Sequence, residues 1–185
     1  YSVAWFGHFL STQYGDIEGI THLDELESIT MKKIWERIGN TGSSALNVID
    51  YILGYEYNSS FIEAWVEFNS RNLFNQLDDS LYYYQDQSMI GPIITPESIE
   101  IEESLFSNNY ILTNSSVKIP SFSIYQQGIL DIIISSPNGD YSGYVAVISD
   151  TGGSLNPIFS GNTEIISEDE KLYLIMNSEN SSSTV

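Results

Sequence analysis

The sequence contains no cysteine among its 185 residues. Disulfide frameworks, thiolate metal sites and cysteine nucleophiles are therefore excluded within this chain. Basic residues are also scarce: 6 lysines and arginines stand against 25 aspartates and glutamates, which gives a formal net charge of −19. Binding to nucleic acids or to anionic membrane surfaces depends on many cations, so the composition argues against both partners.

Long apolar runs are absent too. No stretch approaches the roughly 20 residues that a membrane-spanning helix needs, so we expect no membrane span. Hydrophobic residues nevertheless make up 42% of the chain, which is enough to build a core. The acidic composition, with 13 tyrosines, predicts a bacterial protein that is secreted or held at the cell surface. Because the chain begins at Tyr1 without an initiator methionine or a signal peptide, we expect it to belong to a longer or processed polypeptide.

The first 77 residues have a helical pattern. Apolar residues recur at three- and four-residue spacing over four segments, at 3–13, 31–38, 45–53 and 61–68. Ser43 or Ser44 can cap the third segment, and Ser60 with Glu63 forms the capping box of the fourth. We therefore predict a helical subdomain of about four helices over residues 1–77, and the apolar stripes place three tryptophans in its core, Trp5, Trp35 and Trp65.

The remainder of the chain has the period of two that is typical of strands. Residues 78–91 form an aromatic connector, in which Tyr82, Tyr83 and Tyr84 favour packing between the two halves. Residues 92–185 carry many short alternating runs, which predict an antiparallel β-sandwich as an accessory domain. The polar tail 180–184 is expected to lead into a linker or another module. The predicted fold class is α+β, with a helical subdomain followed by the sandwich.

Two histidines are the first candidates for metal chemistry. His8 is followed by Phe9 and His22 by Leu23, so neither begins the H-E-x-x-H motif that holds a catalytic zinc. The sequence also lacks the Gly-x-Ser-x-Gly elbow and the Gly-Lys-Ser/Thr phosphate loop; Gly152-Gly153-Ser154 reads as a hairpin-like loop. We predict no catalytic, cofactor-binding or metal-binding residues in this chain.

Carboxylates are the remaining candidates. Glu63 and Glu67 lie one helical turn apart, and a glycosidase would need two such groups across a cleft. Further acidic clusters read as solvated loops, at Asp78-Asp79, Glu102-Glu103 and Glu168-Asp169-Glu170. Loops such as Asn138-Gly139-Asp140 or Asp150-Thr151-Gly152 could contribute oxygens to calcium, although neither has the twelve-residue calcium-loop pattern.

Several segments resemble a known family. The matching features are Trp5-Phe6 with Phe9-Leu10, Tyr14-Gly15, Ile34-Trp35-Glu36-Arg37, Ala45-Leu46-Asn47-Val48-Ile49-Asp50, and Ser60-Phe61-Ile62-Glu63-Ala64 running to Phe68. In this pattern residues 1–74 resemble the region after the active site in a family of secreted bacterial zinc metalloproteases of the gluzincin-like, H-E-x-x-H type. The family's zinc ligands and general base lie upstream of that region and have no counterpart here.

The resemblance implies that this chain is the non-catalytic carboxy-terminal portion of an exported metalloprotease-like protein. Its helical subdomain would support the protease cleft, its partner would be the upstream catalytic segment, and zinc would belong to the parent protein. The alternative is an extracellular or cell-surface binding or assembly module that recognises glycan or protein. A stand-alone hydrolase using paired carboxylates is a third reading. An H-E-x-x-H upstream of Tyr1 would favour the first reading.

Overall fold

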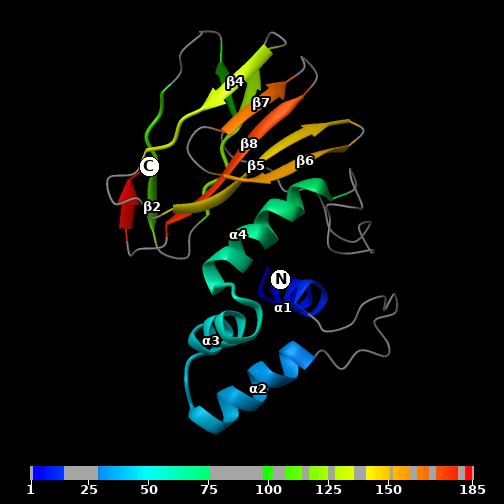
Figure 1. Cartoon of the computed structure of the whole chain (residues 1–185), viewed down its shortest axis with the longest axis vertical. Coiled ribbons are helices and arrows are strands. Elements are labelled where there is room, and N and C mark those ends of the chain that lie inside the picture. Colours follow the sequence, from blue (N-terminus) through cyan, green and yellow to red (C-terminus); the bar gives the residue numbers. More distant parts are fainter. Residues whose placement is uncertain are drawn as a thin grey trace. The chain divides into compact units, whose positions relative to one another are not determined.

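The computed structural model describes a chain of helices followed by strands (Figure 1). The described residues are 2–14, 29–75, 98–101, 107–113, 117–124, 128–135, 141–150, 152–158, 162–166, 170–178 and 182–184. The chain divides into two compact units, Tyr1–Trp65 and Val66–Val185, which we call the helical unit and the sheet unit. The division falls inside the fourth helix, and each unit is described by itself.

The predicted helices are confirmed. They are α1 (Ser2–Gln13), α2 (Ile29–Thr41), α3 (Ala45–Tyr57) and α4 (Phe61–Arg71). Their apolar stripes meet in the core of the helical unit, where the buried side chains are Phe6, Phe9, Leu10, Ile34, Val48, Ile52, Leu53 and Ala64. The ring of Phe6 contacts those of Phe9, Phe61 and Trp65, at centroid distances of 6.0, 5.8 and 5.0 Å respectively. Aromatic packing of this kind fixes how α1 lies against the start of α4.

Short-range hydrogen bonds define the helix ends. The backbone N–H of Ser60 donates to the Glu63 carboxylate at 2.8 Å, and the N–H of Glu63 donates to Ser60 Oγ at 3.1 Å. This is the predicted capping box. Ser44, rather than Ser43, is the N-cap of α3, and Asn58 ends that helix with a left-handed φ of 52°. These caps of α3 and α4 therefore come from residues no more than a few positions away. At the start of α4, the N–H of Phe61 also donates to the carboxylate of Asp50 at 2.9 Å.

The sheet unit is built around one five-stranded sheet of order β1-β3-β8-β5-β6. Its strands are β1 (Ser98–Ile101), β3 (Ser121–Ile124), β8 (Lys171–Ser178), β5 (Tyr141–Ser149) and β6 (Gly152–Pro157). Two further pairs lie outside it: β2 (Ile111–Thr113) with β9 (Ser182–Thr184), and β4 (Gly128–Ile132) with β7 (Asn162–Ile166). In the described residues from 98 onward, every regular element is a strand.

The core of the sheet unit lies on one face of the five-stranded sheet. It contains Phe122, Ile132, Ile134, Val145, Val147, Ile158, Leu172 and Met176. Strand β4 contributes Ile132 to this cluster, so the β4–β7 pair covers part of that face (Figure 1). The alternate residues of β5 and β8, among them Ala146 and Ile175, point to the other face and are buried as well. Both faces of the central strands therefore lose contact with water.

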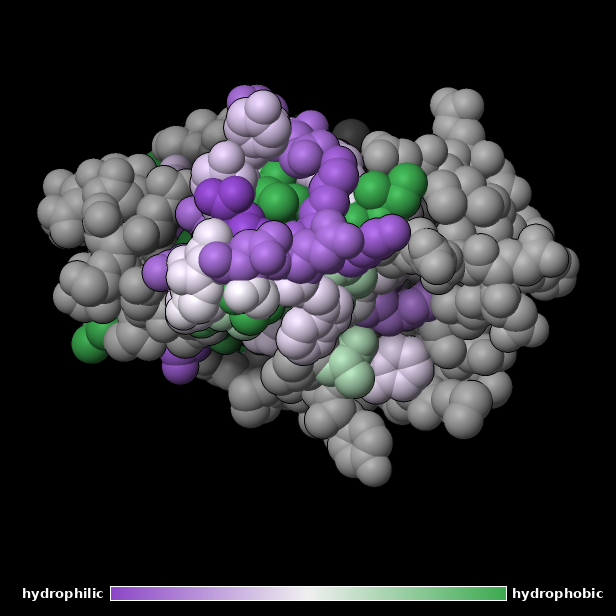
Figure 2. All heavy atoms as spheres, turned by 90° about the horizontal axis from the view of Figure 1, so that it is seen from below, coloured by the Kyte–Doolittle hydropathy of each residue, from purple (hydrophilic) through white to green (hydrophobic). Residues whose placement is uncertain are grey.

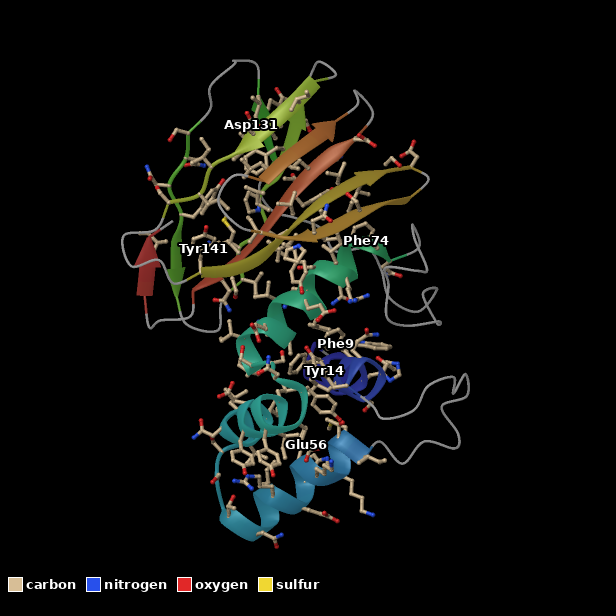
Figure 3. The ribbon with its side chains drawn as sticks, viewed as in Figure 1. Phe9, Tyr14, Glu56, Phe74, Asp131 and Tyr141 are labelled. Atoms are coloured by element: carbon tan, nitrogen blue, oxygen red, sulfur yellow. The ribbon has the colours of Figure 1, made fainter. Side chains whose placement is uncertain are left out.

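Two glycines permit close approach between strands of this sheet. A Cβ on Gly143 would lie 1.9 Å from the carbonyl oxygen of Ile175, and one on Gly153 would lie 2.0 Å from that of Val147. The Gly153 position also has the ring of Phe74 at 3.0 Å. Phe74 ends the 3-10 helix η2 (Asn72–Phe74) after α4 and is fully buried (Figure 3). The missing side chain at Gly153 leaves room for this ring.

The sequence predictions for the second half need correction in two places. The five-stranded sheet is mixed rather than purely antiparallel, because β1 and β3 run parallel. The segment Gly152-Gly153-Ser154 is the start of strand β6, paired with β5, and is not a loop. The structure also places strand β9 within the polar tail, where it pairs with β2. At Gly152-Gly153-Ser154, pairing with the preceding strand overrides a local sequence that is typical of a loop.

The predicted boundary at residue 77 and the aromatic connector 78–91 lie outside the described residues. The contact-based division falls earlier, between Trp65 and Val66. The end of α4 and helix η2 are thereby grouped with the strands. The separate packing role predicted for Tyr82, Tyr83 and Tyr84 stays a prediction.

Candidate functional site

The two histidines lie in different surroundings. His8 is half-buried on α1, with its ring edge-to-face to Trp5 at a centroid distance of 6.4 Å. Burial lowers the pKa of His8 below its ordinary value of 6.5, which favours the neutral imidazole. His22 lies outside the described residues. Within the described part of the chain, no group of three or more His, Asp or Glu residues is placed to hold a metal ion.

The two carboxylates one turn apart on α4 have separate partners. Glu63 accepts the capping hydrogen bond from Ser60 and a further one from the hydroxyl of Ser59 at 3.2 Å. Glu67 accepts from Arg71, with distances of 2.8 Å to Nε and 2.7 Å to Nη2. A catalytic pair would face a common substrate, whereas these carboxylates stabilise the beginning and the end of the same helix.

The other acidic candidates fall largely outside the described residues, at Asp78-Asp79, Glu102-Glu103, Asn138-Gly139-Asp140 and Glu168-Asp169. Asp150 is exposed in the turn between β5 and β6, and Glu170 lies just before β8. The predicted calcium-binding loops therefore stay predictions.

The most distinctive surface feature is a group of three side chains on α2 and α3, which we call the arginine–tyrosine cluster: Arg37, Tyr51 and Tyr55. The guanidinium carbon of Arg37 lies 3.4 Å from the centre of the Tyr51 ring. The rings of Tyr51 and Tyr55 are almost parallel, at 7°, with centroids 5.8 Å apart. Tyr51 is 44% exposed and Tyr55 is 75% exposed. The cluster is thus a pair of accessible aromatic rings with a cation on one of them.

Local sequence explains how the cluster is assembled. Tyr51 and Tyr55 are four residues apart on α3, so they project from neighbouring positions of the same helix face. The Gly42-Ser43-Ser44 segment turns the chain from α2 into α3, with Gly42 at a φ of +66°. This turn brings Arg37 of α2 against Tyr51 of α3. The cluster therefore depends on the packing of two helices.

An ion pair and a hydrogen-bond chain hold the two helices together beside the cluster. Lys33 Nζ of α2 lies 2.6 Å from Glu56 Oε2 of α3, and Figure 3 labels Glu56 on the side of α3 that faces α2. Buried Thr30 hydrogen bonds through its hydroxyl to the Tyr57 hydroxyl at 2.6 Å and to the carbonyl of Tyr14. These contacts limit sliding of α2 along α3, which keeps Arg37 over Tyr51.

The prediction that all three tryptophans belong to the helical core is wrong for Trp35. Its side chain is 66% exposed, whereas the adjacent Ile34 is buried. Consecutive helical residues differ by about 100° around the axis, so a residue beside the apolar stripe can fall outside it. Leu46 of α3 is also exposed, at 50%. Figure 2, which views the molecule from below, shows green apolar side chains among purple hydrophilic ones.

A second polar feature lies inside the sheet unit. Ser142 of β5 and Asn177 of β8 are directly opposite each other in the strand register. Asn177 is fully buried, and neither its amide group nor Ser142 Oγ has a hydrogen-bond partner in the structure that is described. Such groups bind buried water in many proteins. Because Asn177 is enclosed, this position is not accessible to a macromolecular partner, in contrast to the arginine–tyrosine cluster.

Comparisons with family models, curated proteins and solved structures gave no match for this chain. Within the described residues, none of the helices combines the length and the apolar character that crossing a membrane requires. The sequence analysis names Arg37 only within a segment that carries the family resemblance, and it gives no functional role to Arg37, Tyr51 or Tyr55. The available signal was the tyrosine pair at i and i+4 outside the apolar stripe of α3, but only the contact with α2 gives it significance.

Proposed function

We propose that this chain is the non-catalytic carboxy-terminal portion of an exported metalloprotease-like protein, and that its helical unit serves as a recognition surface. The observation that supports a recognition role is the arginine–tyrosine cluster, which leaves Tyr55 75% exposed beside a well-packed helical core. Tyrosine, tryptophan and arginine are the residue types enriched in the energetic centres of protein interfaces. Arg37, Tyr51, Tyr55 and Trp35 place these types on just two helices.

The proposed parent protein rests on the resemblance of residues 1–74 to the region after the active site of gluzincin-like metalloproteases. In this proposal the helical unit contacts the upstream catalytic segment of the same polypeptide and supports the protease cleft. The strands then form the accessory β-sandwich, for which the shared core of β4 with β3, β5 and β8 gives support. Zinc would be bound by the upstream segment and not by this chain.

Reading the coding sequence upstream of Tyr1 is the first experiment. The proposal expects an H-E-x-x-H motif there, and a start codon immediately before Tyr1 would contradict it. If the motif is present, the longer protein should hydrolyse peptides in a zinc-dependent way. The chain 1–185 alone should not hydrolyse casein, with or without added zinc. Casein hydrolysis by this chain that a chelator abolishes and zinc restores would also contradict the proposal.

The alternative function is an extracellular or cell-surface binding or assembly module. The same exposed tyrosine pair favours it, since aromatic rings also provide stacking surfaces for sugars and for partner proteins. The two proposals differ in the source of the partner. A portion of a metalloprotease contacts the upstream segment of its own polypeptide, whereas a separate module binds a glycan or another protein. An upstream sequence without H-E-x-x-H would favour the separate module.

A further inference from the structure

The position of Arg37 on Tyr51 determines where its hydrogen-bond donors point. At 3.4 Å from the ring centre, the guanidinium carbon is in van der Waals contact with the ring. A guanidinium that pointed an N–H at the ring would hold this carbon farther away, so the group lies flat on the ring face. Because the guanidinium is planar, its N–H groups then point sideways, parallel to the ring. Stacking on Tyr51 thus does not itself use these donors.

Arg37 differs from the arginine at the end of α4. Arg71 gives both Nε and Nη2 to the carboxylate of Glu67. Among the residues that the structure describes, no carboxylate or carbonyl oxygen accepts a hydrogen bond from the Arg37 guanidinium. This contrast is informative because the chain has 25 acidic residues and only 6 basic ones. An arginine in such a chain has many possible carboxylate partners, yet Arg37 is stacked on a ring instead.

We propose that the arginine–tyrosine cluster binds a side-chain carboxylate of a protein partner, with Arg37 holding the carboxylate and Tyr51 and Tyr55 covering an adjacent apolar side chain. An arginine fork matches the two oxygens of a carboxylate, and each N–H donor that is used strengthens the contact. The apolar side chain beside that carboxylate can pack on the exposed ring of Tyr55 and so be removed from water. The inference rests on the proposed recognition role of the helical unit and names the chemistry of its partner.

A protein partner fits the surroundings better than a sugar acid. A single uronate would occupy the cluster alone, but the same two helices also expose Trp35 at 66% and Leu46 at 50%. Protein interfaces bury several such side chains together, around a centre of tyrosine, tryptophan and arginine. The chain's net charge of −19 opposes strongly anionic partners at long range, so the partner is expected to carry a local carboxylate rather than a high negative charge.

Two matched peptides test the inference with the whole chain. One carries a single glutamate between two leucines, and the other carries glutamine at that position. We expect the glutamate peptide to shift the NMR signals of the Tyr51 and Tyr55 rings and to bind about threefold to tenfold more tightly than the glutamine peptide. A disaccharide containing glucuronate is titrated in parallel.

Three variants locate the effect. Arg37→Gln should remove the preference for glutamate, and Arg37→Lys should restore only part of it, because lysine keeps the charge but lacks the planar fork. Lys171→Gln, an exposed position on β8, changes the net charge equally and should leave binding unchanged. Circular dichroism checks that each variant is folded. Tyr55→Ser, at the most exposed ring, provides a second probe with little risk to the fold.

Three results would overturn the inference: equal binding of the two peptides, binding that Arg37→Gln leaves unaltered, or binding of glucuronate alone. Absence of binding by either peptide would overturn it as well. These outcomes are independent of the upstream sequence. A missing H-E-x-x-H would refute the proposed parent protein while leaving glutamate binding measurable, and loss of the glutamate preference would refute only the ligand chemistry.

Discussion

The helical unit and the sheet unit differ in how far along the chain the contacts that form their secondary structure reach. In the helical unit, the α4 cap joins Ser60 to Glu63, and α2 packs on the next helix, α3. In the sheet unit, β3 pairs with β8 about fifty residues later, and β8 pairs again with β5. Local signals therefore specify the helices of the first unit, although its core also joins distant residues such as Phe6 and Trp65. The central sheet of the second unit depends on pairings that no short segment encodes.

The same difference appears in the glycines. Gly39 of α2 has no atom within 4 Å of the position of a Cβ, whereas Gly143 of β5 faces a carbonyl oxygen of the neighbouring strand at 1.9 Å. At Gly39, a different residue would therefore change only the local helix propensity. A glycine in the sheet is a requirement of the pairing between two distant strands.

The largest expected effect comes from Gly143→Ala. The new methyl group would overlap the carbonyl oxygen of Ile175, so we expect the free energy of unfolding to fall by at least about 4 kcal/mol. Gly39→Ala is the matched control and should stabilise the protein by up to about 1 kcal/mol. Urea unfolding followed by circular dichroism measures both. Similar effects of the two substitutions would contradict the distinction between the two kinds of glycine.

The second prediction concerns the core of the helical unit. Leu53→Ala should lower the free energy of unfolding by about 3 kcal/mol, because Leu53 is fully buried and its removal leaves a cavity. Leu46→Ala on the same helix removes an exposed side chain and should change it by less than about 0.5 kcal/mol. Tryptophan fluorescence is a suitable readout, since all three tryptophans lie in this unit. Equal costs would mean that burial on α3 is assigned wrongly.

The third prediction tests how local the helix caps are. Ser60→Ala should cost about 1 kcal/mol, because it leaves the N–H of Glu63 without its acceptor. Ser43→Ala should be nearly neutral, since Ser44 and not Ser43 is the N-cap of α3. Thermal unfolding of the two variants provides the comparison. A larger loss for Ser43→Ala than for Ser60→Ala would show that the caps are placed incorrectly.

The smallest expected effect is a pH dependence from His8. Its pKa is lowered in the folded chain, so the unfolded chain binds the proton first as the pH falls. The native protein should then lose less than about 1 kcal/mol of stability as the pH falls from about 7.5 through 6.5 to 5. His8→Gln removes this contribution. The carboxylates contribute equally to the native protein and to the variant, so the difference between the two proteins at about pH 7.5 and about pH 5 isolates His8. An identical pH dependence of stability in the two proteins would refute the lowered pKa of His8.

Much of the helical unit could be predicted from the sequence, because the signals lie within one or two turns. The stripe containing Ile34 and the capping box at Ser60 are read directly from residue spacing. The prediction that Trp35 lies in the core is wrong, because Trp35 is immediately beside the apolar stripe. Only the packing of the helices shows whether a residue at the edge of a stripe is buried or exposed. The role of Tyr51 was not predictable, because it depends on Arg37 fourteen residues earlier.

The strands were predictable as strands, but not their partners. The described residues from 98 onward form strands, as the alternating runs predict, and Phe122 and Leu172 of these strands lie in the core. The polar residues of β9 and the glycines of β6 gave no strand signal, because hydrogen bonding to another strand does not require apolar side chains. The parallel pairing of β1 with β3 was also missed, since alternation carries no direction.

By itself, the sequence determined the acidic character of this protein, the absence of cysteine chemistry, the four helices and the change from a helical to a strand pattern. These properties depend on composition or on residues close together in the chain. The tertiary structure alone decided the order and direction of the strands, the need for glycine at 143 and the meeting of Arg37 with Tyr51 and Tyr55. The physical reason is that hydrogen bonding and packing between distant segments depend on three-dimensional proximity, which local spacing does not encode.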